Sequence, residues 1–168
     1  MNILAISGSG SLLNSNVALL EAIMKLFSNK HTTDVYHGLR DFPLFRPEDL
    51  EQELPKEVKT FKEKLTKADF IFISTPEYTH NIPAVLKNAF EWVTASGEFQ
   101  HKKVFPITFT PHPPRGKYAM QSLLTSLKAM DATIVGQLSL YKNEVNFEGY
   151  TIHLSKELNL LFDEVIVL

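Results

Sequence analysis

The run Phe70-Ile71-Phe72-Ile73 is apolar at every position and is the strongest strand pattern in the sequence. A strand that is apolar on both faces belongs in the middle of a sheet that is covered on both sides. Outward from this run, short apolar stretches alternate with longer segments whose apolar residues recur at helical spacing. The other expected strands are Ile3–Ile6, Thr32–His37, Val104–Phe109 and one that begins with Thr133–Val135.

Helices are expected between these strands, and a β-α-β-α order with helix-length crossovers requires a parallel sheet covered on both faces. We therefore predict an α/β fold, a doubly wound sandwich of about five parallel strands with helices on both faces. Residues Gly38–Pro55 contain three prolines and several acidic residues and are expected to form a long loop. No linker or repeat interrupts residues 1–168, so a single domain is expected. The expected helices cover residues 15–28, 58–68, 83–93, 123–130 and 155–167.

The composition excludes several classes of protein. The 17 Lys and Arg against 19 Asp and Glu leave a net charge of −2, which argues against a nucleic-acid partner. The absence of cysteine excludes disulfides and thiolate metal sites, and the six histidines show no paired metal spacing, so no metal is assigned. The sequence shows neither a signal-peptide pattern nor an apolar run of about 20 residues. We expect a cytoplasmic protein with no membrane partner.

Three strand-to-helix junctions carry unusual chemistry: residues 7–16, 75–83 and 110–116. They follow the first, third and fourth expected strands. In the flavodoxin-like strand order 2-1-3-4-5 these strands are central neighbours, and ligands bind at the carboxyl ends of such strands. The order therefore predicts that the three loops converge on one crevice.

The first loop opens a helix, where free N–H groups and the helix dipole attract anions. Its side chains add neutral donors that could hold a phosphate monoester. The alternative is that Asn14 or Ser15 merely caps the helix while the glycines serve a tight turn. The loop is neither a P-loop nor a dinucleotide fingerprint, because it lacks a Gly-Lys-Ser/Thr end and has Leu13 in place of the third glycine. The candidate donors are Ser9, Ser11, Asn14, Ser15 and Asn16.

The second loop places an aromatic residue between Pro76 and Pro83, which stiffen the backbone. Glu77 could act as a general acid or base, although a carboxylate on an open loop is more often solvated or ion-paired. Tyr78 could stack on a ring or simply pack.

The third loop is stiff as well, and its Arg115 and Lys117 could neutralise a phosphate or an anionic ring, or could lie solvated at the surface. No nucleophile elbow or Ser-His-Asp arrangement occurs. We assign no catalytic side chain, which favours a cofactor that brings its own chemistry.

Two segments resemble the NAD(P)H-dependent FMN reductase family, which includes azoreductases, quinone reductases and chromate reductases. Residues 75–92, Thr-Pro-Glu-Tyr-Thr-His-Asn-Ile-Pro-Ala-Val-Leu-Lys-Asn-Ala-Phe-Glu-Trp, are similar to the family signature T-P-E-Y-N-x-S-x-P-G-x-L-K-N-A-x-D-W. Residues 6–20 resemble the phosphate-loop pattern G-S-x-R-x-x-S-x-N. The chain departs from the family where Ser11 replaces the phosphate-loop arginine and Asn14 replaces its serine.

The resemblance implies an FMN cofactor with NADPH or NADH as the electron donor. The phosphate of FMN would lie against the first loop. The isoalloxazine would lie beside Pro76–Thr79, with its polar edge at the N–H groups of Glu77, Tyr78 and Thr79. Residues Thr110–Gly116 would close the other side of the ring. The residues implied for the cofactor are Ser9, Ser11, Asn14, Ser15, Asn16, Pro76, Glu77, Tyr78, Thr79, Thr110, Pro111 and Gly116.

The family also implies a homodimer or homotetramer, and Phe90, Trp92 and Phe99 could contribute to a subunit contact or to ordinary core packing. The expected function is hydride transfer from NAD(P)H to FMN N5 and onward transfer to a quinone, azo compound, metal oxyanion or free flavin. The loss of the arginine keeps a second hypothesis open, an FMN-binding electron carrier without efficient NAD(P)H turnover. A third is an α/β protein that kept the fold and lost the cofactor.

Overall fold

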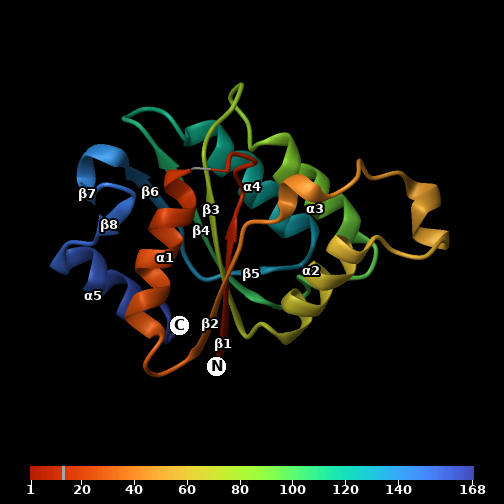
Figure 1. The fold of residues 1–168 in the computed structure, drawn as a ribbon, viewed down its shortest axis with the longest axis horizontal. Helices are drawn as coiled ribbons and strands as arrows, with labels where there is room; N and C mark the ends of the chain where they lie inside the picture. Colours follow the sequence, from red (N-terminus) through yellow and green to blue (C-terminus); the bar gives the residue numbers. More distant parts are fainter. Residues whose placement is uncertain (13) are drawn as a thin grey trace.

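The computed structural model describes residues 1–12 and 14–168, and a six-stranded sheet lies at its centre. All its strands pair in parallel, in the order β2-β1-β3-β4-β5, and β6 continues beside β4. The predicted order 2-1-3-4-5 is therefore confirmed (Figure 1). The strands are β1 (Asn2–Ser7), β2 (Thr32–Tyr36), β3 (Phe70–Thr75), β4 (Lys103–Thr110), β5 (Thr133–Ile134) and β6 (Leu138–Tyr141).

The central strand β3 is buried at every residue, as its apolar run predicts. Its side chains alternate between two hydrophobic clusters, one on each face of the sheet: Ile71 and Ile73 join the first, and Phe70 and Phe72 join the second. Because each face buries its own set of apolar side chains, helices must cover both sides of the sheet.

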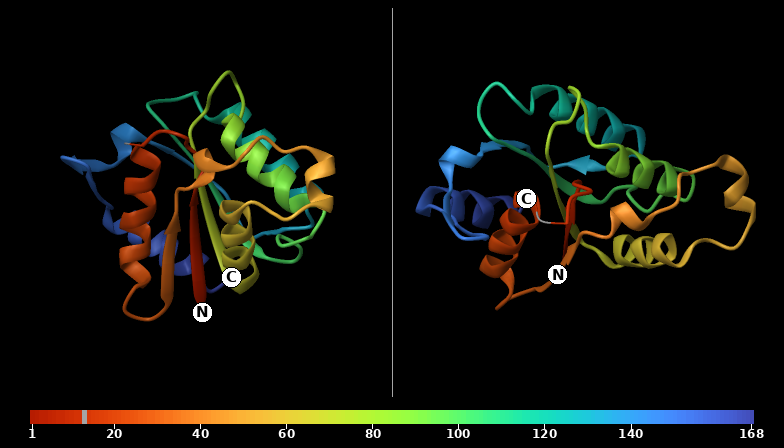
Figure 2. Two further views of the ribbon diagram at one scale, coloured as in Figure 1. Left: turned by 45° about the vertical axis from the view of Figure 1, so that its right-hand side comes forward. Right: turned by 45° about the horizontal axis from the view of Figure 1, so that its top comes forward.

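Five helices provide this cover. Helices α1 (Ser15–Phe27) and α5 (Lys156–Val165) pack on one face, and α2 (Lys56–Lys67), α3 (Ala84–Thr94) and α4 (Lys117–Ala129) pack on the other. Figure 2 shows the two layers separated by the sheet in both turned views. The aromatic residues Phe90, Trp92 and Phe99 are at most 3% exposed and lie in the core beneath α3. Of the two roles considered for them, core packing is the one that the structure supports.

The fifth predicted strand is in fact broken into β5 and β6. β5 pairs with β4 as far as Val104, and β6 resumes the pairing at Ile107. Pro106 stands in the gap, and a proline has no N–H to give to a neighbouring strand. In the same gap Gly136 packs so closely on β4 that an added Cβ would lie 2.9 Å from the Phe105 ring.

Two features after residue 36 were not predicted. The long loop 38–55 contains two short 3-10 helices, η1 (Leu39–Asp41) and η2 (Pro47–Glu51). A further 3-10 turn, η3 (Lys142–Glu144), follows β6 and leads into an antiparallel hairpin of β7 (Asn146–Glu148) and β8 (Thr151–His153). These strands are too short to give a periodic signal in the sequence. The hairpin lies beside α1 and so extends the layer on that face (Figure 1).

In residues 1–12 and 14–168, no helix combines the length and the apolar character that crossing a membrane requires.

Candidate functional site

The loops that follow β1, β3 and β4 meet around one hollow of about 270 Å³, which we call the crevice. These three loops lie at the carboxyl edge of the sheet, at the top of Figure 1. The lining includes every residue predicted to hold a cofactor except Thr79 and Gly116. It consists of Ser9, Ser11, Asn14, Ser15, Asn16, Pro76, Glu77, Tyr78, Phe109, Thr110, Pro111, Arg115 and Lys142.

The first loop is held by its own side chains. Asn14 caps α1, because its Oδ1 accepts the Val17 N–H at 2.9 Å while its Nδ2 donates to the Ser11 carbonyl at 2.7 Å. The capping alternative is thus correct for Asn14. The Ser11 N–H donates to Ser9 Oγ at 3.2 Å, so the loop is preorganised around the start of the helix. The first turn of α1 contains no acidic residue, so the positive end of the helix dipole is not offset there.

Two further contacts tie this loop to the centre of the sheet. The Ser74 hydroxyl donates to Asn16 Oδ1 at 2.7 Å, and both side chains are buried. The Gly8 N–H donates to the Ser74 carbonyl at 2.8 Å, and an added Cβ at Gly8 would lie 2.7 Å from Leu86 Cδ2. The glycine is therefore required by close packing against α3. Leu13, which the sequence analysis considered in this loop, lies outside the described residues.

The second loop is a tight turn that exposes an aromatic side chain at the crevice. Tyr78 and Asn81 exchange both backbone hydrogen bonds at 2.9 Å, and Thr79 and His80 form the tip with φ of 52° and 56°. The Tyr78 N–H, one of three expected to meet a ring edge, is therefore already used within the turn. Thr79 lies at the exposed tip, outside the lining. The Tyr78 side chain is 51% exposed and lines the crevice.

Glu77 has a role that the sequence did not indicate. Its side chain is only 7% exposed, and its Oε2 accepts the N–H groups of Tyr118 and Ala119 at 3.0 and 3.1 Å. Burial alone would raise the pKa of Glu77, but these N–H donors, that of Gly116 and the nearby His80 outweigh burial and hold the pKa below its usual value. The carboxylate therefore caps the start of α4 and also lies 3.6 Å from Nδ1 of His80, and its lowered pKa makes it a weak general base.

The positive charges of the crevice come from the second half of the chain. Arg115 lines it from the third loop, whereas Lys117, the other cation considered there, does not. Lys142 reaches it because Tyr141 pairs with Thr110, which brings the end of β6 to the same edge of the sheet as the end of β4. Sequence reasoning missed Lys142 because the hairpin region gave no pattern from which its position could be inferred.

Gly116 supports the third loop from behind. It adopts a left-handed conformation with φ of 98° at the start of α4, and an added Cβ would lie 2.9 Å from Thr108 Oγ1. The Thr110 hydroxyl donates to the Arg115 carbonyl at 3.1 Å and closes the same turn. Gly116 thus shapes the wall of the crevice without lining it.

The chemistry of this lining suits a phosphorylated, flat ligand. Serine hydroxyls, asparagine amides and two cations can bind an anion, and Tyr78 and the stiff Pro76 and Pro111 can flank a ring. The carboxylate of Glu77 accepts two N–H groups at the start of α4, which partly offset its negative charge. No cluster of three or more potential metal-ligating side chains occurs in the described part of the chain.

Comparisons with known proteins find one matching family, relatives in sequence and similar solved structures. Residues 1–146 match the profile of the family described as NADPH-dependent FMN reductase. The chain is 35% identical over 127 residues to the NADH:(hydroxy)cinnamate reductase subunit CrdA of Vibrio ruber, an alignment that covers 76% of this chain and 62% of that protein. It is also 35% identical over 92 residues to the NADH-dependent flavin reductase subunit 2 of Lactobacillus johnsonii, covering 55% of this chain and 48% of the relative.

The matched region thus spans between about half and two thirds of these two relatives. Among solved structures, the flavoenzyme NAD(P)H:(acceptor) oxidoreductase FerB from Paracoccus denitrificans superposes with a TM-score of 0.72. That match covers 99% of this chain and 93% of FerB at 19% identity, and at this identity it shows a shared fold alone.

Proposed function

The chain belongs to the NADPH-dependent FMN reductase family, and from this premise we propose that it is an FMN-dependent oxidoreductase acting on a small-molecule acceptor. Family membership implies FMN as the cofactor and NADH or NADPH as the donor. The observation that carries the proposal is the crevice, in which neutral donors, two cations and an exposed tyrosine converge from separate loops. When bound there, FMN supplies hydride acceptance at N5 and electron transfer to the acceptor.

The residues present fit this cofactor. The start of α1 and the hydroxyls of Ser9, Ser11 and Ser15 would bind the phosphate, with positive charge from Arg115 and Lys142. Tyr78 and the adjacent prolines would flank the ring and exclude water from one side of it. No side chain has to move a proton during hydride transfer, so the protein contributes orientation and the exclusion of water.

The acceptor we propose is a quinone, an azo compound, a metal oxyanion or a free flavin. Relatives named as a flavin reductase, a quinone reductase and an NADPH azoreductase support this range. The crevice is open at the sheet edge, so a flat acceptor could replace the nicotinamide after the first half-reaction.

A titration of the apoprotein with FMN tests the proposal most directly. We expect quenching of flavin fluorescence with saturation at one FMN per chain, and rapid bleaching near 450 nm (a general flavin band) after anaerobic addition of NADH or NADPH. Protein that leaves FMN fluorescence unchanged would contradict the assignment and leave only the fold.

A second candidate is an FMN-binding electron carrier that receives its electrons from another polypeptide. It is favoured by the names of the two relatives described above, both of which are called subunits. The same experiment separates the two functions: a flavin that binds but stays oxidised with both nucleotides indicates the carrier, and one that bleaches rapidly indicates the reductase.

A further inference from the structure

A second hollow, of about 440 Å³, adjoins the crevice at the start of α1. It lies between α1 and the β7–β8 hairpin, and we call it the side hollow. Asn14, Ser15 and Lys142 line both the side hollow and the crevice. A ligand that occupies the crevice with its phosphate at the start of α1 could therefore extend past this shared wall into the side hollow.

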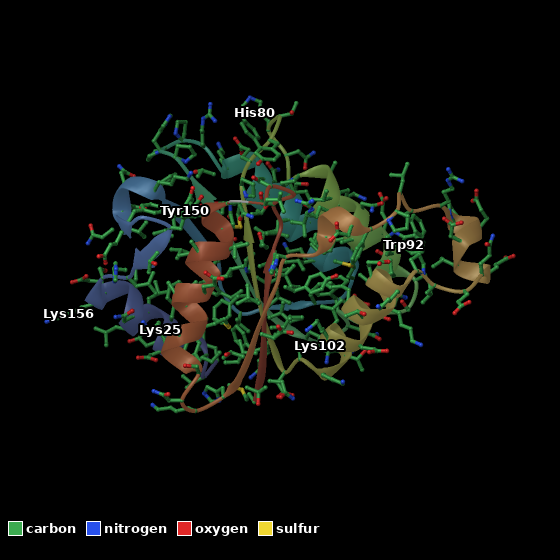
Figure 3. All side chains as sticks on the ribbon, in the orientation of Figure 1. Lys25, His80, Trp92, Lys102, Tyr150 and Lys156 are labelled. Carbon is green, nitrogen blue, oxygen red and sulfur yellow. The ribbon has the colours of Figure 1, made fainter. Side chains whose placement is uncertain are left out.

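The outer wall of the side hollow is aromatic. Phe147 is 43% exposed, and its ring stacks at 6.4 Å between centroids and 16° between planes on Phe109, which itself lines the crevice. Tyr150 is 76% exposed and makes no ring contact with any residue that the structure describes. Figure 3 labels Tyr150 beside the N-terminal end of α1.

Core contacts fix this aromatic wall in place. Ile152 of β8 is only 4% exposed and belongs to the hydrophobic cluster on the α1 face, and β8 packs along α1. Gly149, in the turn of the hairpin, has φ of 59° and open space where a Cβ would be. Ile152 thus anchors the hairpin to the core, while the Tyr150 side chain remains exposed at the hollow.

The lining of the side hollow combines three kinds of group. Asn14, Ser15 and the cation Lys142 form the wall shared with the crevice, the rings of Phe147 and Tyr150 line the hollow from the hairpin, and Glu21 lines it from α1. A phosphate joined to a flat heterocycle with an exocyclic amine has a complementary set of groups. The amine could donate to a carboxylate, and the heterocycle could stack on an aromatic ring.

We propose that the side hollow binds the adenosine 5′-phosphate half of a dinucleotide whose other half occupies the crevice. The inference rests on the proposed function, since the crevice must first take a flavin or a nicotinamide. Two kinds of dinucleotide carry this group. FAD is FMN extended at its phosphate by an adenylate. NADH carries the same adenylate on its diphosphate, and NADPH carries it with a further phosphate at the 2′ position of the ribose.

Titration of the apoprotein with FMN and with FAD tests FAD as the ligand that supplies the adenylate. FAD should bind the unmodified protein about tenfold more tightly than FMN, because a base stacked on an aromatic side chain contributes on this scale. Tyr150→Ala should remove that advantage and leave FMN affinity unchanged. Tyr150→Phe keeps the ring and should retain the advantage, and far-UV circular dichroism of each variant checks that the hairpin change has not unfolded the protein.

Titration of the apoprotein with ADP-ribose tests the pyridine nucleotide as the ligand, because the wall shared by the two hollows is then not occupied by the FMN phosphate. Binding that Tyr150→Ala weakens about tenfold supports the side hollow as the adenylate site of the pyridine nucleotide. If the protein binds FMN but Tyr150→Ala changes neither the affinity for FAD nor that for ADP-ribose, this inference is overturned and the proposed function stands. Failure to bind FMN at all overturns the proposed function and this inference with it.

Discussion

The carboxylate of Glu77 joins two loops that lie far apart along the chain. The structure buries it and uses it to cap α4, whose Tyr118 lies 41 residues further along the chain. No local pattern connects residues so far apart, because their contact exists only after the sheet has brought the two loops together.

Replacement of this carboxylate should lower stability in a pH-dependent way. Glu77→Gln removes a charge that interacts with the start of a helix, and we expect a loss of about 1 kcal/mol at neutral pH. The folded-state pKa is depressed, so the contribution is fully present above the unfolded pKa of about 4.3 and disappears as the pH falls through the lower folded value. Urea denaturation of both proteins at pH 7 and at successively lower pH measures the difference.

Glu91→Gln serves as the matched control. Glu91 pairs with Lys87 on an exposed face of α3, and exposed ion pairs contribute only about 0.2–1 kcal/mol. If Glu77→Gln lowers the free energy of unfolding by no more than Glu91→Gln does, the capping contacts contribute little to stability.

Tyr78 should matter more than Glu77 for flavin binding. Tyr78 is half exposed at the crevice, whereas Glu77 directs its carboxylate into α4. Tyr78→Ala should weaken FMN binding about tenfold, the scale of a lost ring contact, and Glu77→Gln should change it less. Fluorescence titration of both variants gives the ranking, and the reverse order would assign Glu77 a direct role at the ligand.

Lys142 should act on the phosphate of the flavin rather than on its ring. Lys142→Met should weaken FMN binding roughly five- to tenfold while leaving riboflavin, which has no phosphate, bound as before. Lys117→Met is the control, because Lys117 is exposed near the third loop but does not line the crevice. Equal losses for FMN and riboflavin would mean that the lysine acts through the shape of the hollow instead of its charge.

At the level of secondary-structure elements, the strand that breaks into β5 and β6 could have been anticipated from Pro106. A proline in a central strand leaves one position without a donor, and the neighbouring strand is interrupted at that position. The β7–β8 hairpin could not have been anticipated, since strands of three residues give no alternation to detect. Lys142 lies in the 3-10 turn before this hairpin and Tyr150 lies in the turn of the hairpin itself, so the least predictable segment contributes to both hollows.

The junction between β1 and α1 depends on contact with β3 and α3, which leads to a prediction at Gly8. Gly8→Ala should destabilise the protein by about 1–3 kcal/mol, because the new methyl would meet Leu86 and Thr75 in a packed region. It should also weaken FMN binding by displacing the loop that follows. Thermal denaturation and an FMN titration measure the two effects.

Gly10→Ala provides the comparison for Gly8. Its new Cβ would lie 3.3 Å from Val85, a milder approach, so a smaller loss of stability is expected. Equal losses for the two variants would indicate that loop flexibility rather than contact with α3 decides the result.

For the molecule as a whole, the fold could be predicted and the distribution of charge around the crevice could not. Apolar runs such as that of β3 indicate which segments are strands and that both faces of the sheet are covered, because burial follows hydrophobic periodicity. The order 2-1-3-4-5 comes from the flavodoxin-like pattern of such folds, and the structure has this order. The same order correctly implied that the loops after β1, β3 and β4 would converge. The cap formed by Glu77 and the approach of Lys142 depend on loop geometry, which leaves no periodic trace in the sequence.

The crevice draws its donors from residue 9 onward and its last cation from residue 142. A ribosome adds about 5–20 residues each second, and the N-terminal end of the chain emerges from it first. The phosphate loop therefore emerges long before the lysine that stands opposite it. During synthesis the growing polypeptide therefore presents an incomplete phosphate site until residue 142 has emerged, and full binding of the cofactor is expected only after that point.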